Sequence, residues 1–263
     1  MKNRSLILFV FLIFLACSDL LSKETDFSEE QIISKNIGLR KININYKNEI
    51  LNYKIFWEII PAGEAEMGIE TTELYKHKVY HIYTNTKSNK SLDLIYKVRN
   101  KTDSYVDIDG LYSLKFVKDQ NEAGYVSHDE VVFNHVDNFW YYLPDKTTSY
   151  IPTFVQDVVS SLYWLRLQNI EVGKKYTFQV WVGKVVYPMI VDVIKVCKIK
   201  VFDEEYECFK VEPIVDIKSF PLFRARGRLF VYITTDERKL PVRLESKIFI
   251  GRVFADLENY YVK

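Results

Sequence analysis

The sequence predicts a mainly β fold: a large antiparallel meandering sheet, or a partly open barrel, with one bracing helix. After residue 41, apolar and polar residues alternate in one short stretch after another, as they do in strands with one buried face. Clusters of Asn, Asp, Gly and Lys separate these stretches at nearly regular intervals, which is typical of a meander or barrel. The composition agrees, because the 263 residues include 19 Tyr and 17 Phe but few Gly and Pro.

The expected strands fall into two runs, one on each side of a helical segment. Alternation begins at 41–46 and continues through 51–57 and 65–69. The first run then covers 78–86, 92–99, 103–109, 111–118, 126–134 and 138–143. The second covers 175–183, 185–195, 196–202, 206–215, 225–233, 240–250 and 252–262. No change of composition and no long linker interrupts 41–263, so we expect a single β-rich domain.

One segment between the two runs has the period of a helix. Its apolar residues recur every three or four positions, at Val155, Val158, Val159, Leu162, Tyr163 and Leu165. Pro152 stands near its start and Gly173 follows its end, where both residue types are common. This spacing predicts one α-helix over about 154–168 that plugs or braces the sheet.

The N-terminus has the layout of a secretory signal. Lys2 and Arg4 precede an apolar run over 5–16, which is too short to cross a hydrocarbon core of about 30 Å as a helix. The run ends in Leu15-Ala16-Cys17-Ser18, which resembles a bacterial lipobox, although Leu15 stands where a small residue is commoner. We therefore expect 1–17 to be a lipoprotein-type signal peptide that ends at Cys17. The alternative is a plain secreted protein in which Cys17 has no role.

In the lipoprotein interpretation, Cys17 carries diacylglycerol through a thioether, and more than one acyl chain gives stable anchoring. Residues 18–40 are rich in Ser, Lys, Asp, Glu and Asn and are expected to form a flexible tether with a reach of roughly 70 Å. The expected location is the bacterial cell envelope, on the periplasmic face and at the outer membrane. A soluble periplasmic or secreted protein is the alternative.

The two remaining cysteines, Cys197 and Cys208, lie on either side of an expected hairpin turn near 202–204. An envelope compartment permits a disulfide between them. Two thiols on neighbouring strands are the alternative, since a bridge also requires a short separation between the two Cα atoms.

The histidines do not predict a metal site. His77 and His81 are four apart on an expected strand, which places them on one face but about 13 Å from each other. His128 and His135 flank another strand. Neither a phosphate-binding glycine loop nor a hydrolase or zinc-protease motif is present, so no cofactor is expected.

The charges argue against a nucleic-acid partner and against catalysis. The formal net charge is +1, whereas nucleic-acid binders are usually basic. Asp236 and Glu237 are expected at an exposed hairpin tip, where carboxylates keep ordinary pKa values and are unsuited to acid–base work. We therefore do not expect an enzyme.

One basic stretch leaves two interpretations open. Arg224, Arg226 and Arg228 share one face of an expected strand. They form either a solvated or salt-bridged face, or a contact for an anionic glycan, a lipid headgroup or an acidic strand of a partner.

Several segments together resemble one family. They are NYKIFWEIIPAGEAEMGIE, QDVVSSLYWLR, EVGKKYTFQVWVGKVVYPMIVDV, YECFKVEPIV and GRLFVYITTDERKLPVRLESKIFIGRVFADLENY. In this order they are similar to the DUF3108 family of exported bacterial proteins, over roughly 48–262. The resemblance implies a β-rich envelope protein, often a lipoprotein, with no assigned reaction and no catalytic residues to transfer.

Two functions follow as expectations. The first is a tethered binding or carrier module for a lipid or an envelope glycan. The second is a structural partner in an envelope or surface-polysaccharide assembly. An apolar cavity of more than a few hundred Å³ would favour the binding or carrier module, and a filled core with a flat exposed apolar patch would favour the structural partner.

Overall fold

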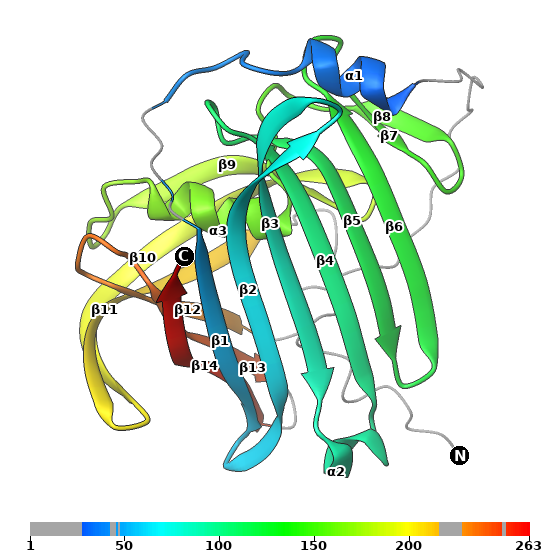
Figure 1. Ribbon diagram of the computed structural model, residues 1–263. Coiled ribbons are helices and arrows are strands. Elements are labelled where there is room, and N and C mark those ends of the chain that lie inside the picture. The colour runs from blue at the N-terminus through cyan, green and yellow to red at the C-terminus, as the bar shows by residue number, and fades with distance from the viewer. Residues whose placement is uncertain (1–27, 43–45, 47, 216–227, 249–250) are drawn as a thin grey trace.

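The computed structural model describes residues 28–42, 46, 48–215, 228–248 and 251–263. Within them the expected mainly β fold is confirmed, as a single antiparallel sheet of fourteen strands (Figure 1). The strands are β1 Glu49–Trp57, β2 Ile60–Leu74, β3 His77–Ser88, β4 Val98–Asp107, β5 Ser113–Glu122, β6 Tyr125–Asn134, β7 Phe139–Tyr142, β8 Thr147–Tyr150, β9 Lys175–Val182, β10 Val185–Val201, β11 Glu204–Val215, β12 Arg228–Thr234, β13 Pro241–Ile248 and β14 Gly251–Val262. The helices are α1 Glu29–Lys35, α2 Lys90–Asp93 and α3 Val158–Arg166.

The sheet consists of two meanders that meet at its centre. Its strand order is β8-β7-β6-β5-β4-β3-β2-β1-β14-β13-β12-β11-β10-β9. All neighbouring strands are antiparallel. The two strands of each pair are consecutive in sequence, except β1 and β14, whose pairing joins the two meanders. The β1–β14 register runs from Glu49 opposite Val262 to Trp57 opposite Val253, with one bulge at Asn52/Tyr53.

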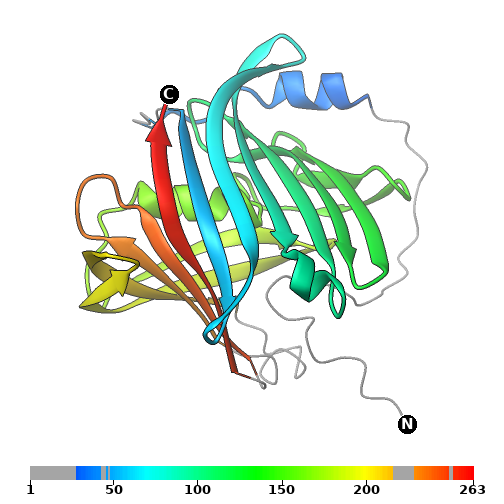
Figure 2. The same cartoon turned by 60° about the horizontal axis from the view of Figure 1, so that its bottom comes forward.

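The sheet coils so that its second meander crosses behind the first (Figures 1 and 2). Contact between the two layers centres on Trp181 of β9, whose ring packs 5.9–6.3 Å from the rings of Phe116, Phe133 and Trp140. The backbone of Gln156 adds a parallel bridge to β9. Its N–H donates to the carbonyl of Gln179 at 2.9 Å, and its carbonyl accepts from the N–H of Trp181 at 2.8 Å. The hydrogen-bonded ladder stays open, but side chains fill the space between the layers.

Helix α3 lies between the layers and braces the sheet as expected. Val159 and Tyr163 join the core of the first meander, and Leu165 joins the core of the second. The helix is shorter than the predicted 154–168, because Asp157 accepts hydrogen bonds from the amides of Val159 and Ser160 and so caps it. The residues before the cap are extended and pair with β9 instead.

Two strand predictions were wrong. The segment 92–99 lies in α2 and the following turn, and β4 begins only at Val98, because Asn89 caps a short helix through Leu92. The stretches 185–195 and 196–202 form one continuous strand of 17 residues, β10, with a bulge near Val193 that takes the place of the expected turn.

The predicted tether of 18–40 is also too long. Within it, α1 packs on the first meander, with Ile32 and Ile33 buried beside Val132 and Tyr141. Residues 29–35 therefore belong to the folded body. Among the described residues, no helix is long and apolar enough to span a bilayer.

Candidate binding groove on the outer face

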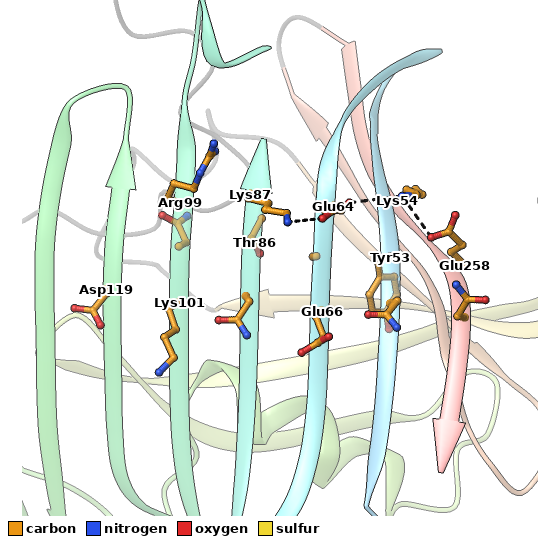
Figure 3. A pocket seen from close by; sticks show the side chains of 15 residues that line it. Tyr53, Lys54, Glu64, Glu66, Thr86, Lys87, Arg99, Lys101, Asp119 and Glu258 are labelled. Carbon is orange, nitrogen blue, oxygen red and sulfur yellow. Dashed lines mark ion pairs between the residues drawn. The ribbon is translucent and has the colours of Figure 1, made fainter. Parts of the chain in front are cut away.

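A groove of about 540 Å³ crosses the outer face of β14, β1, β2, β3, β4 and β5. Figure 3 shows its side chains on the face of the sheet that is turned away from α3. The inward residues of the same strands, such as Tyr53 and Ala65, pack in the core. Because side chains of a strand alternate between faces, every second residue of these strands points outward into the groove. The residues between them, such as Tyr53 and Ala65, border it from beneath.

The floor of the groove is a row of polar residues that runs across the strands, which we call the transverse row. Each member is the direct cross-strand partner of the next: Asn259, Asn52, Glu66, Asn85, Lys101 and Asp119. Neighbouring strands lie about 4.8 Å apart, so the row is roughly 24 Å long. It is suited to an elongated polar ligand.

Three amides of this row have free hydrogen-bonding capacity. The side chains of Asn52, Asn85 and Asn259 make no hydrogen bond to any group in the described part of the chain. Each amide offers two N–H donors and a carbonyl acceptor. The row can therefore both donate to and accept from the hydroxyl groups of a ligand.

A second row, next to the first, is held by ion pairs. Lys87 Nζ lies 2.7 Å from Glu64, and Lys54 Nζ lies 3.6 Å from Glu64 and 3.5 Å from Glu258 (Figure 3). The hydrogen bond from Lys87 lowers the pKa of the Glu64 carboxyl. These charges are exposed, so they contribute little to stability, but they keep this wall of the groove ionised at neutral pH.

An aromatic side chain borders the transverse row on its other side. Tyr83 lies across Gly68, since a Cβ atom at Gly68 would meet the Tyr83 ring at about 2.5 Å. His81 lies beside it, with ring centroids 5.5 Å apart, and stacks on Tyr105 at 4.8 Å. The groove thus combines free amides, charges and a flat aromatic border.

His81 carries a charge more readily than an isolated histidine. Burial acts to lower its pKa, but hydrogen bonds with Asp103 at 2.8 Å and Glu70 at 3.3 Å outweigh this and raise the pKa. Burial alone would also raise the pKa of Asp103, but its bonds with His81 and Lys101 lower it. The aromatic border therefore includes a histidine that lies between two carboxylates, both of which favour its charged form.

The buried ionisable groups lie elsewhere and make structural contacts. Asp157 accepts from the hydroxyls of Ser104 at 2.5 Å and Ser113 at 2.6 Å, and burial raises its pKa. His135 donates through Nε2 to the carbonyl of Ser113 and accepts the Phe154 amide at Nδ1. Because His135 bonds the carbonyl and not the hydroxyl of Ser113, the group lacks the arrangement of a serine nucleophile and its base.

A buried ion pair connects α3 to the centre of the sheet. Arg166 is paired with Glu49 of β1 and donates to the carbonyl of Arg238 at 3.1 Å. Its guanidinium also lies 5.5 Å from the ring centroid of Tyr46 and 5.0 Å from that of Tyr163. The pair fixes the helix over the β1–β14 seam.

Of the residues that the sequence suggested, Cys17, Arg224 and Arg226 lie outside the described residues. Arg228 forms a two-pronged ion pair with Glu212 of the adjacent strand, at 2.5 and 2.6 Å. Of the two interpretations of this basic stretch, the structure shows the salt-bridged strand face for Arg228. Arg228 does not line the groove.

Cys197 and Cys208 are direct cross-strand partners on β10 and β11, as the hairpin prediction requires. Both are thiols in this structure. Burial raises the pKa of the Cys208 thiol to about 12, and the neighbouring Cys197 adds to the effect.

His77 and His81 both lie on β3, as expected, whereas His128 lies within β6 and only His135 follows its end. The described residues contain no cluster of His, Cys, Asp and Glu able to hold a metal ion. His128 lies at the end of the transverse row, opposite Asp119, and bonds it at 2.7 Å. The groove itself was missed by sequence reasoning, because its members come from six strands whose register no local pattern reveals.

The fold and the groove together define an open, β-barrel-like protein with a polar surface site. A profile of the DUF3108 family, described as a protein of unknown function, matches residues 52–258, so the chain belongs to that family. The resemblance inferred from the sequence is therefore confirmed. No curated protein matches the chain.

A solved structure supports the fold. It is the β-barrel-like protein of domain of unknown function DUF1849 from Brucella abortus, with a TM-score of 0.61 and 11% sequence identity. The match covers 84% of this chain and all of the other. At this identity the likeness concerns the fold alone.

Proposed function

We propose that this protein is a lipid-anchored protein of the bacterial cell envelope whose β domain binds a glycan without altering it. The transverse row is the observation that carries the glycan assignment. Its three free amides, flanked by charged groups and bordered by Tyr83, provide the donors, acceptors and flat aromatic surface that hydroxyl-rich ligands need. A lipid chain would need an apolar lining instead.

A binding role without catalysis is supported by the state of the titratable groups. The charged groups in the second row of the groove, Lys54, Glu64, Lys87 and Glu258, are exposed and paired with opposite charges. The strongly shifted groups, such as Asp157 and His135, are buried in contacts that hold α3 and the strands. Catalytic sites usually place shifted groups in the cleft itself.

The anchor and the location rest on the N-terminal sequence. The lipobox-like stretch ends at Cys17, and α1 begins at Glu29 on the surface of the folded body. An acylated Cys17 would hold the domain at a membrane of the envelope, and we propose the periplasmic face of the outer membrane.

The test is to isolate the protein from its native envelope and identify what is bound by native mass spectrometry and glycan analysis. We expect a bound glycan that is lost in Asn52→Ala/Asn85→Ala. Glu205→Ala, which removes an exposed acid outside the groove, is the matched control and should retain it. Empty protein would refute glycan binding, and stable protein partners recovered by crosslinking would favour the structural role in an envelope assembly.

A further inference from the structure

Three connections at one end of the sheet each carry two adjacent, exposed, large apolar residues. The exposed fractions are 91% and 56% for Ile59 and Ile60, 89% and 75% for Leu94 and Ile95, and 40% and 71% for Tyr125 and Val126. Ile59 and Ile60 lie where the β1–β2 connection enters β2, Leu94 and Ile95 lie in the β3–β4 connection, and Tyr125 and Val126 begin β6 directly after the β5–β6 connection. Figures 1 and 2 show these three connections at the same end of the sheet. We call these six residues the apolar rim.

The opposite end of the same strands is built differently. There the connections pack against α1 or turn inward: Tyr75 donates to Glu29 at 2.9 Å, and Leu111 is fully buried. None of the rim residues belongs to a core cluster of the described chain. The opposite end exposes single apolar residues, Tyr75 at 36% and Val136 at 47%, but its described connections have no adjacent pair like those of the rim.

The charges around the rim are unbalanced toward positive. Of its acidic neighbours, Glu58 is paired with Arg252 at 3.2 Å and Asp93 with Arg99 at 2.6 Å. Glu122, opposite Tyr125, is buried and accepts a hydrogen bond from Asn100. Lys90 and Lys97 are exposed and form no ion pair with any described residue. The surplus charge suits an anionic surface.

We propose that the apolar rim is a membrane-docking surface that inserts into the headgroup region of a bilayer rich in anionic phospholipid. Alternate connections lie about 10 Å apart, so the rim consists of three separate projections and not a continuous patch. A fluid bilayer fills the gaps between such projections, whereas a protein partner needs a packed, contiguous core. Exposed aliphatic residues beside a tyrosine and lysines are the composition of interfacial membrane anchors.

The length of the N-terminal segment is compatible with this orientation. Residues 18–28 can reach about 38 Å when extended. The 12 residues of β3, which run from the α1 end to the rim end, span about 40 Å. Fully extended, the segment is about 2 Å shorter than this strand, so an acylated Cys17 comes close to the level of the rim, and docking does not require it.

Fluorescence quenching by brominated phospholipid tests the proposal, because it reports depth whichever way the chain is anchored. Leu94→Trp and Val126→Trp place a probe on two different rim projections of the full chain. Tyr150→Trp, at an equally exposed position on β8, is the control (70% exposed). On vesicles of phosphatidylcholine with phosphatidylglycerol, both rim probes should be quenched and blue-shifted relative to the parent protein, and the control should be unchanged.

Two results would overturn the proposal: rim probes quenched no more than the control, or only one of the two rim probes quenched. Lys90→Glu/Lys97→Glu, added to Leu94→Trp, tests the charge. Quenching should be stronger on vesicles with phosphatidylglycerol than on pure phosphatidylcholine, and the lysine variant should remove this difference. An undiminished difference would refute the role of the lysines. A melting temperature equal to that of the parent shows that each variant is folded.

Discussion

At the scale of single residues, His135 shows how burial fixes a protonation state. Burial lowers its pKa to about 4, because the charged form would lose its hydration. The neutral ring donates to Ser113 and accepts from Phe154, so one tautomer satisfies both partners. The residue acts as a structural cross-link that works only when uncharged.

This state predicts a loss of stability in acid. A folded-state pKa near 4, below the ordinary value of about 6.5, means that the contribution of His135 is complete above pH 6.5 and is lost as the pH falls toward 4. Between pH 7 and pH 5 the free energy of unfolding should fall by about 2 kcal/mol from this residue. Urea titrations at both values measure it. In His135→Gln, the free energy of unfolding should fall by about 2 kcal/mol less over this pH range than in the wild type. An equal fall in the two proteins would contradict the prediction.

Gly68 is the second residue with a specific consequence. An added Cβ would overlap the outer end of the Tyr83 ring, so Gly68→Ala should displace the aromatic border of the groove and destabilise the protein by about 1 kcal/mol or less. In Gly68→Ala/Tyr83→Ala the overlap is gone, and thermal unfolding should show less than the sum of the two single effects. Additive effects would mean that the ring does not rest on this glycine.

Few of these residue roles can be predicted from sequence. Arg228 could be placed on an exposed strand face, because alternation alone determines that. The partners of His135 could not be predicted, because its contacts depend on how the sheet coils. The contact between Tyr83 and Gly68 could not be predicted either, because it depends on the register of β2 and β3. A single strand shows which face a side chain occupies but not what it meets there.

At the scale of elements, the stability of α3 depends on its N-cap residue, Asp157. Asp157 caps the helix and also accepts hydroxyls from two strands, so it connects α3 to β4 and β5. Asp157→Ala should lower the free energy of unfolding by about 3 kcal/mol, since it removes a cap and leaves buried hydroxyls without a partner. Asn89→Ala, at the exposed cap of α2, should cost only about 1 kcal/mol. Equal losses in chemical denaturation would refute the linking role of Asp157.

The β10–β11 hairpin predicts a redox-sensitive pair. Cys197 and Cys208 face each other across the ladder, which brings their side chains within the range where a bridge can form. We expect a disulfide in protein isolated from an oxidising envelope, seen by mass spectrometry as the loss of two hydrogen atoms that reductant restores. Persistence of two alkylatable thiols under oxidising conditions would refute it. Cys197→Ser is the control for incorrect pairing.

The helix and most strands could be predicted from periodicity, and the errors have physical causes. At 92–99 an apolar stretch suggested a strand, but Leu94 and Ile95 are exposed beside a capped turn. Sequence alone does not distinguish apolar residues that pack in a core from those that meet another surface. In β10 the bulge at Val193 interrupted the alternation without ending the strand.

At the scale of the whole molecule, the chain is expected to have two attachments to a membrane: the lipid at Cys17 and the apolar rim. Cys17→Ala should convert a protein that only detergent extracts into one that high salt removes, since the remaining contact depends on lysines and is screened by salt. Fractionation of cell envelopes measures this. A variant that still requires detergent would refute the lipid anchor. Wild-type protein released by salt alone would do the same.

The architecture was predicted to the level of a large antiparallel meander, because regular spacing of strands and turns suffices for that. The coiling and the groove could not be predicted. The transverse row joins Asn52 to Asn259 across the β1–β14 pairing, and nothing in either segment alone specifies the other. The site depends on contacts between residues that are far apart in sequence, which a single sequence does not reveal.

The seam between β1 and β14 has a further consequence, for the order in which the protein folds. Each meander can grow hairpin by hairpin from local contacts, but the seam closes a loop of nearly the whole domain, and such closure is slow. Because β14 leaves the ribosome after all the strands from β2 to β13, one edge of β1 remains unpaired until β14 has been synthesised. Unpaired edges promote association with other chains. The centre of the finished sheet is thus the part of the nascent protein that most needs a chaperone.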